Sequence, residues 1–222
     1  LSLVGSEMCI RDSSSSYLYI TDERGDMQLA VNDMAVCNEI SPEYLESVLP
    51  GIQAGALVLD TNLPVESLEF ICRSSCIPLY ADPVSSVKAM KLHGVMKHLR
   101  AIKPNALEAA ALTGQTDPEL AARALIDEGV QRVFISLGTN GMIAAEGSRI
   151  LRMPSPEANV VNATGAGDAA MSAIVWADLH GLSLEDSARA AQLAGAITCA
   201  SEESNAPELS RPVSSTHLRA HE

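Results

Sequence analysis

Hydrophobic and polar residues follow two different periods along this chain, and segments of the two kinds alternate. Short apolar runs are typical of buried strands, whereas apolar residues that recur every three or four positions predict helices. Such an order predicts a parallel α/β sheet with helices on both faces. The predicted strands of this alternating part are 56–60, 77–81, 98–103 and 132–137. The predicted helices are 64–73, 84–92, 106–113, 117–127 and 184–200.

Two hairpins are predicted in addition. Residues 17–20 and 27–31 read as two strands joined by a turn in which Gly25 supplies a positive φ. Residues 142–145 and 149–153 read as a second pair. Both hairpins interrupt the strand–helix order, so they add antiparallel strands to an otherwise parallel α/β chain.

The composition limits the classes of protein to which this chain can belong. The chain has 222 residues, enough for one domain with a substantial core. It is 47% hydrophobic but only 3% aromatic, so alanine and leucine must fill most of that core. A formal net charge of −13 excludes a general attraction to nucleic acid or to an anionic membrane. No apolar run is long enough to span a bilayer.

The cysteines show neither a metal-binding spacing nor a disulfide framework. We interpret them as reduced thiols of a cytoplasmic protein. They are Cys9, Cys37, Cys72, Cys76 and Cys199.

Both ends of the chain break the pattern of their neighbours. Residues 4–13 (VGSEMCIRDS) and 211–222 (RPVSSTHLRAHE) resemble translated sequencing-adapter sequence. We therefore expect a domain over 14–210, with 1–13 and 211–222 as non-native tails that take no part in the fold.

The stretch 159–170, NVVNATGAGDAA, carries the most chemistry. An apolar run at Val160 and Val161 predicts a strand or extended chain, and an alanine-rich helix follows the glycines. Gly165 and Gly167 permit a tight turn and a close ligand. The first N–H groups of a helix lack partners and carry the positive end of its dipole, so this turn suits a phosphate.

Asp168 does not fit a pure anion site, because a carboxylate repels an anion. It could instead take the proton from a hydroxyl that attacks the phosphate. A simpler interpretation is a turn followed by an acidic residue in the first helical turn, where the helix dipole favours it.

The string NATGAGDAA resembles the D-T-x-G-A-G-D signature of the ribokinase-like, PfkB-type carbohydrate kinases. The resemblance implies a three-layer α/β/α sandwich with a mostly parallel sheet and a small β lid, here residues 17–31. It implies a catalytic base at Asp168 and an anion hole for phosphate from Thr164, Gly165, Ala166 and Gly167. Asn162 and Ala163 depart from the signature, which leaves open the monovalent-cation loop of the family.

A second element lies at the end of the strand 98–103. In KPNALE, Asn105 and Glu108 are spaced as a helix-capping box. The same letters resemble the KPNxxE element with which these kinases organise Mg²⁺ near the ATP phosphates. Because Glu108 could cap the helix and hold a metal-bound water, both roles stay open.

Other strand ends supply weaker candidates. Asp82 could cap a helix or face the phosphates and Mg²⁺, and Asp60 and Asn62 could cap or lie near the acceptor substrate. The nucleotide side is expected from the resemblance of SLGTNG to T-x-G-x-x-G and from the last helix. Those nucleotide-binding candidates are Ser136, Gly138, Gly141 and Asn205.

Within the family, ITDERGDMQLAVNDM and VNATGAGDA most resemble the pseudouridine kinases. This implies transfer of a phosphoryl group from ATP, with Mg²⁺, to the 5′-hydroxyl of a C-nucleoside. A kinase of ribose, fructose or another nucleoside, and an inactive nucleotide-binding fragment, are alternatives. The relatives carry a Gly-Gly-Asn sugar-binding element that we do not find, so we expect the C-terminal two-thirds of an enzyme. The resemblance also leaves open a homodimer formed through the lid.

Overall fold

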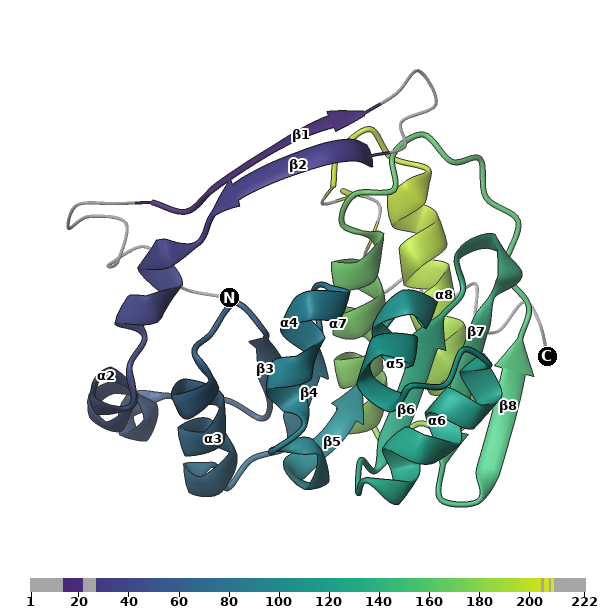
Figure 1. The fold of residues 1–222 in the computed structure, drawn as a ribbon. Helices are drawn as coiled ribbons and strands as arrows, with labels where there is room; N and C mark the ends of the chain where they lie inside the picture. The colour runs from purple at the N-terminus through teal and green to yellow at the C-terminus, as the bar shows by residue number, and fades with distance from the viewer. Residues whose placement is uncertain (1–13, 22–26, 205, 208, 210–222) are drawn as a thin grey trace.

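The computed structural model describes residues 14–21, 27–204, 206, 207 and 209, and both suspected tails lie outside these residues. It is a three-layer α/β/α sandwich with a separate two-stranded hairpin, which confirms the predicted fold class (Figure 1). The six strands of the central sheet lie side by side in sequence order. They are β3 (Leu57–Asp60), β4 (Leu79–Asp82), β5 (Leu99–Ile102), β6 (Arg132–Ser136), β7 (Met142–Glu146) and β8 (Arg149–Met153).

The sheet is parallel from β3 to β6, and β7 and β8 are antiparallel, as the sequence predicted. Alternate residues of each inner strand enter two different cores. In β6, for example, Val133 and Ile135 pack on one face and Phe134 packs on the other, and all three are fully buried. Both faces of the parallel strands are therefore covered, which explains their continuous apolar runs.

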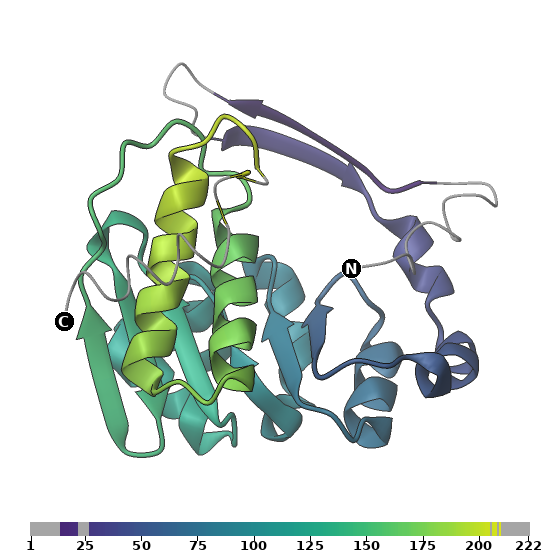
Figure 2. The same cartoon turned by 180° about the vertical axis from the view of Figure 1, so that it is seen from behind.

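Helices cover the two faces unequally (Figures 1 and 2). One face carries α3 (Val65–Ser74), α4 (Ser86–Ala89), α5 (Ala106–Thr113) and α6 (Pro118–Asp127). The other carries α7 (Ala166–Leu179) and α8 (Leu184–Cys199), which pack against each other. Short helices at the start of the chain and between these elements are η1 (Ala35–Glu39), α2 (Pro42–Val48), η2 (Leu49–Gly51), η3 (Met90–Leu92), η4 (Met96–His98) and η5 (Gly138–Asn140).

The hairpin of β1 (Ser16–Thr21) and β2 (Met27–Asp33) is the predicted lid. In both views it extends across the end of the molecule where α7 begins (Figures 1 and 2). The turn predicted around Gly25 lies outside the described residues. Leu18, Ile20 and Val31 point into solvent, with exposed fractions between 62% and 73%.

An ionic network holds the C-terminal end of α7 to the sheet. Asp178, whose side chain is only 7% exposed, pairs with Arg100 of β5 and Arg132 of β6. It also accepts a hydrogen bond from the Tyr80 hydroxyl of β4. Burial alone would raise the pKa of the Asp178 carboxyl, but the hydrogen bonds from Arg100 and Tyr80 and the arginine charges outweigh it and lower that pKa. The N-terminal end of α7, at the other end of the helix, faces the carboxyl ends of the strands.

Candidate active site

The candidate site lies where the parallel strands end. Asp60 and Asp82 are the last residues of β3 and β4 and stand opposite each other in the ladder. Lys103 follows β5 directly, and its amide donates to the Ala81 carbonyl. Parallel strands bring their carboxyl ends to one edge of a sheet, where α/β proteins bind ligands. Three sequence-distant segments therefore place charged side chains at this edge.

Lys103 and Asp82 form the central contact of the site. The Lys103 Nζ lies 2.9 Å from Asp82 Oδ2. Asp82 also accepts through Oδ1 from the Val84 amide at 3.1 Å, so it caps the following turn as well. Asp82 therefore stabilises the turn after β4 and pairs with Lys103, but Ser85, and not Asp82, caps the following helix α4. A position of Asp82 facing the phosphates and Mg²⁺ stays a prediction.

The first turn of α7 completes the edge. A Cβ placed on Gly167 would lie 3.5 Å from Lys103 Nζ, so the lysine reaches the predicted anion hole. Asp168 keeps contact with solvent, but desolvation by the surrounding protein raises its pKa above the ordinary value. The charges of Asp82 and Asp60 raise it further, and Lys103 lowers it. A raised pKa moves a carboxylate toward the basicity that a general base needs.

Gly165 fits its position for two reasons. Its φ of +85° is left-handed, and a Cβ there would lie 2.1 Å from the Ser204 carbonyl oxygen. Just before it, Asn162 accepts from the Thr164 amide and donates to the Glu202 carbonyl. The Asn162 side chain thus ties the glycine turn to the segment after α8. Val160 and Val161 are more than half exposed and belong to no strand; they lie in the loop between β8 and α7.

Asn105 and Glu108 form the predicted capping box at the start of α5. The Asn105 side chain accepts from the Glu108 amide at 2.9 Å, and Glu108 Oε2 accepts from the Asn105 amide at 2.8 Å. Glu108 is buried, and this burial raises its pKa. The hydrogen bond from Asn105 and the charge of Lys103 lower that pKa, whereas the charge of Asp82 raises it. Glu108 therefore caps α5, and its charge also interacts with the charges of Lys103 and Asp82 in the site.

The remaining candidates lie around this centre. Ser136 ends β6 and bridges to Asn105, so it is a neighbour of the α5 cap. Gly138 and Gly141 follow in a tight turn with φ values of +58° and +94°. Asn205 lies outside the described residues.

Asp60 and Asn62 are bonded to each other rather than to the centre. The Asp60 carboxylate accepts from the amide of Asn62 and from its side chain, and Lys88 donates to the Asn62 side chain at 2.6 Å. The charge of Asp60 reaches Asp168, as the pKa of Asp168 indicates. This group forms the outer side of the site, next to β3.

No group of three or more His, Cys, Asp or Glu side chains in the described part of the chain is arranged to hold a metal ion. The acidic oxygens at the edge nevertheless fit Mg²⁺, which retains several waters and takes its remaining ligands from one or two carboxylates and the phosphates of a substrate. Of the carboxylates at this edge, Asp82 and Glu108 would be the ones to hold the ion, and the charge of Asp82 reaches Glu108.

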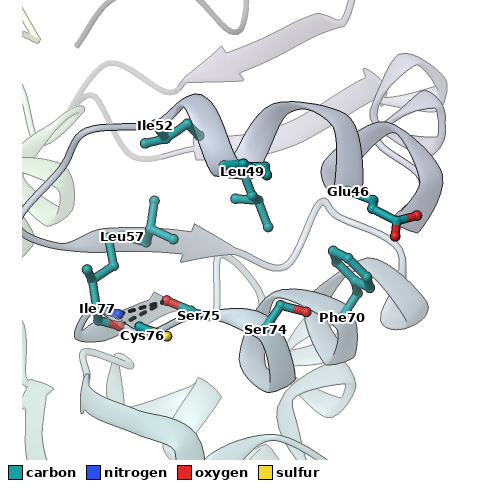
Figure 3. Close-up of a pocket in the computed structure, with 10 residues that line it drawn as sticks. Glu46, Leu49, Ile52, Leu57, Phe70, Ser74, Ser75, Cys76 and Ile77 are labelled. Carbon is teal, nitrogen blue, oxygen red and sulfur yellow. Dashed lines mark hydrogen bonds between the residues drawn. The ribbon is translucent and has the colours of Figure 1, made fainter.

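A pocket of about 480 Å³ lies elsewhere. Its lining includes Leu57 at the start of β3, Phe70 of α3 and Ile77 before β4 (Figure 3). Leu57 and Ile77 lie at the amino ends of β3 and β4, so the pocket is remote from the acidic edge. No helix among the residues described is long and apolar enough to cross a membrane, and the four cysteines described are free thiols.

Lys103 is the site residue to which the sequence pattern gave no role. The signal was available, because a lysine between a buried strand and a helix cap stands at the ligand-binding edge of a parallel sheet. What the pattern lacked was the pairing register that brings Asp82 beside it.

A parallel α/β sheet whose acidic edge faces a glycine-rich helix N-terminus is typical of proteins that bind phosphorylated ligands. The chain belongs to the pfkB family of carbohydrate kinases, whose sequence model matches residues 6–211.

Individual relatives agree with this family. The chain is 34% identical over 207 residues to pseudouridine kinase of Escherichia coli, covering 90% of this chain and 66% of that protein. A carbohydrate kinase from Agrobacterium tumefaciens matches with a TM-score of 0.78 at 28% identity, covering 95% of this chain and 70% of that one. Ribokinase from Thermotoga maritima has the same fold, with a TM-score of 0.81 at 19% identity over 93% of this chain and 70% of its own. The chain thus spans about two-thirds of the length of these relatives.

Proposed function

We propose that this protein transfers the γ-phosphoryl group of ATP to a hydroxyl of a nucleoside or sugar, with Asp168 as the general base. The observation that carries the proposal is the position of Asp168. It stands in the first turn of α7, beside the glycine turn, and its pKa is raised by partial desolvation and by the charges of the acidic strand ends. Pure phosphate binding gains nothing from a carboxylate there, whereas deprotonation of an attacking hydroxyl does.

The roles of the other residues follow from their places. The backbone N–H groups of Gly165, Ala166 and Gly167 would stabilise the charge that develops on the transferred phosphoryl group. Mg²⁺, held through waters near Asp82 and Glu108, would neutralise phosphate charge when bound. The strand end at Ser136–Gly141 and the segment after α8 would receive the nucleotide.

Pseudouridine is the acceptor that we propose, because the relative with that name is 34% identical to this chain. A ribose or fructose kinase is the alternative, since ribokinases are among the relatives of this chain. We also propose a cytoplasmic location, because ATP is present there and thiols stay reduced.

We further propose that the protein forms a homodimer through the apolar face of the lid, which is supported by the exposed side chains of Leu18, Ile20 and Val31. Sedimentation of the purified protein tests this proposal.

Phosphoryl transfer from labelled ATP to a panel of acceptors tests the function. We expect transfer to pseudouridine, and we expect Asp168→Asn to lower kcat by about 10²–10⁴-fold, the usual contribution of a general base. ATP affinity should be kept or slightly raised, because a charge that repels the γ-phosphate is removed. Asp186→Asn, an acidic residue in the first turn of α8, is the matched control and should leave the rate unchanged. Transfer by Asp168→Asn at the parent rate would reduce Asp168 to an acidic residue in a turn.

A further inference from the structure

Lys88 is a cation on the outer side of the site that takes part in no ion pair among the described residues. It belongs to α4 and is partly buried. Its ammonium donates to Asn62 Oδ1 at 2.6 Å, although the carboxylate of Asp60 belongs to the same group of side chains. In a chain with a formal net charge of −13, a lysine that contacts a neutral amide in place of a carboxylate indicates a specific role in the site.

The side-chain amide of Asn62 lies between two groups of opposite hydrogen-bonding character. An ammonium can only donate and a carboxylate can only accept, so the amide fits between Lys88 and Asp60 in one orientation. Its oxygen accepts from Lys88, and its nitrogen donates to Asp60 Oδ2 at 3.0 Å. A half-turn of the amide would set its oxygen against the carboxylate and its nitrogen against the ammonium. The contact with Lys88 therefore fixes the orientation of Asn62.

The orientation of Asn62 in turn holds the carboxylate of Asp60. The Asn62 backbone amide donates to Asp60 Oδ1 at 2.7 Å, and the side chain donates to Oδ2, so each carboxylate oxygen accepts one hydrogen bond. A carboxylate has about four lone-pair sites, so each oxygen can accept another bond. Because Asp60 is exposed, these remaining sites are open to the hydroxyl groups of a bound molecule.

Two neighbouring elements lie close to this group. Lys91 of η3 donates to two carbonyls of the loop after β3, each at 2.9 Å, and so holds the main chain of that loop. Desolvation raises the pKa of the Cys37 thiol in η1, the charge of Asp60 raises it further, and the charges of Lys88 and Lys91 lower it. The helix η1, which follows lid strand β2, is therefore within electrostatic reach of the group. Asp60 thus lies near the base of the lid.

We propose that Lys88 is a positioning residue for the acceptor: it fixes the Asn62 amide, which holds the Asp60 carboxylate ready to accept hydrogen bonds from acceptor hydroxyls. This inference rests on the phosphotransfer function proposed above and concerns the acceptor side of that reaction. Lys88 touches no reacting atom, and no proton moves through it. Its loss should weaken acceptor binding, whereas ATP binding at the glycine turn should be unaffected.

Steady-state kinetics of the full chain tests this role. Lys88→Met keeps the aliphatic stem and removes the charge, and Lys88→Arg keeps the charge. Lys97→Met, at an exposed lysine of η4, is the control and should match the parent. We expect Lys88→Met to raise the KM for the acceptor by about 10–100-fold, equivalent to one hydrogen bond to a charged group, at unchanged kcat and KM for ATP. Lys88→Arg should recover part of the affinity, and an unchanged acceptor KM in Lys88→Met would overturn the proposal.

A double-mutant cycle shows whether Lys88 acts through Asn62. If it does, Asn62→Ala should have the same acceptor KM with and without Lys88→Met, because the link to Asp60 is already broken. Additive effects of the two substitutions would mean that Lys88 acts independently of Asn62, and the proposal would then be wrong.

A measurement without turnover separates this inference from the proposed function. The side-chain NH₂ group of Asn62 gives a pair of signals in a proton–nitrogen correlation spectrum, identified by their absence in Asn62→Ala. Lys88→Met should shift these signals, and Lys97→Met should leave them in place. Signals that stay in place in Lys88→Met contradict the contact, even where phosphate is transferred. Shifted signals in a protein whose parent form transfers no phosphate support the contact and refute the proposed function alone.

Discussion

Replacing Asp178 tests how α7 is held in place. The Asp178 carboxylate accepts from Arg100 Nε at 2.7 Å and from Tyr80, and it lies 3.1 Å from Arg132 Nη1. Asp178→Asn keeps the shape of the side chain but removes the charge that two arginines share. It also turns an amide NH₂ toward them.

The size of the effect follows from what each arginine retains. Removing one partner of a buried ion pair costs about 3–5 kcal/mol. Arg100 is partly exposed and keeps Gln131, and Arg132 keeps Glu146, so the cost should fall at the low end, about 3 kcal/mol. For a chain of this size, that corresponds to a melting temperature lower by about 6–12 °C.

The pH dependence gives an independent check on the cause. The folded pKa of Asp178 is lowered relative to an unfolded value of about 3.9, so its contribution to stability is complete above that pH. It is lost as the pH falls through the folded pKa. The difference between parent and Asp178→Asn should therefore be full at pH 7 and shrink below about pH 4.

Urea unfolding at pH 7 and at pH 3.5, followed by circular dichroism, measures both effects. The control is Asp127→Asn, an exposed aspartate at the end of α6, which should change stability by less than about 0.5 kcal/mol. Equal stability of Asp178→Asn and parent at pH 7 would refute the view that this network anchors α7. A difference that persists undiminished in acid would show that packing, and not charge, is lost.

Two further substitutions test the other end of the site. Glu108→Gln keeps an oxygen that can accept from the Asn105 amide, so the melting temperature should be unchanged while the Mg²⁺ concentration for half-maximal transfer rises. Glu119→Gln is the control, and if both variants need the same Mg²⁺ concentration, Glu108 is only a helix cap. Gly165→Ala should destabilise the fold and weaken ATP binding, because its Cβ would meet the Ser204 carbonyl at 2.1 Å. Gly181→Ala is the control, because Gly181 has a similar φ of +70° but open space around it. It measures only the cost in stability of a left-handed alanine, about 1–2 kcal/mol. Equal losses of stability in the two variants would exclude the clash.

Local signals in the sequence explain which parts were predictable. Helix 106–113 was placed correctly at both ends because Asn105 caps its start and Gly114, with a left-handed φ of +70°, caps its end. The segment 84–92 was predicted as one helix, yet the structure divides it into α4 and η3. Val84 takes a positive φ of 61° and delays the helix start to Ser86, a strained conformation that periodicity does not reveal.

The charged contacts were less predictable for a different reason. Asp82 and Lys103 are far apart in the chain, and the Asp178 network joins α7 to three strands. Each contact depends on strand order and register, which no local pattern specifies. The sequence could place Asp82 and Glu108 at strand and helix ends, but it could not say which cation would stand between them.

The helix dipole has opposite signs at the two ends of α7, so the carboxylates at these ends need different neighbours. A carboxylate at a helix C-terminus is unfavourable, because the dipole is negative there, so Asp178 is tolerated only through its arginines. The N-terminal end is favourable for anions and carries Asp168. Since α7 has 14 residues and behaves as a rod about 20 Å long, fixing Asp178 fixes the distance between the glycine turn and Lys103. Loss of the Asp178 contacts should therefore lower the stability of the fold directly. It should slow phosphoryl transfer only to the extent that it lets the first turn of α7 move.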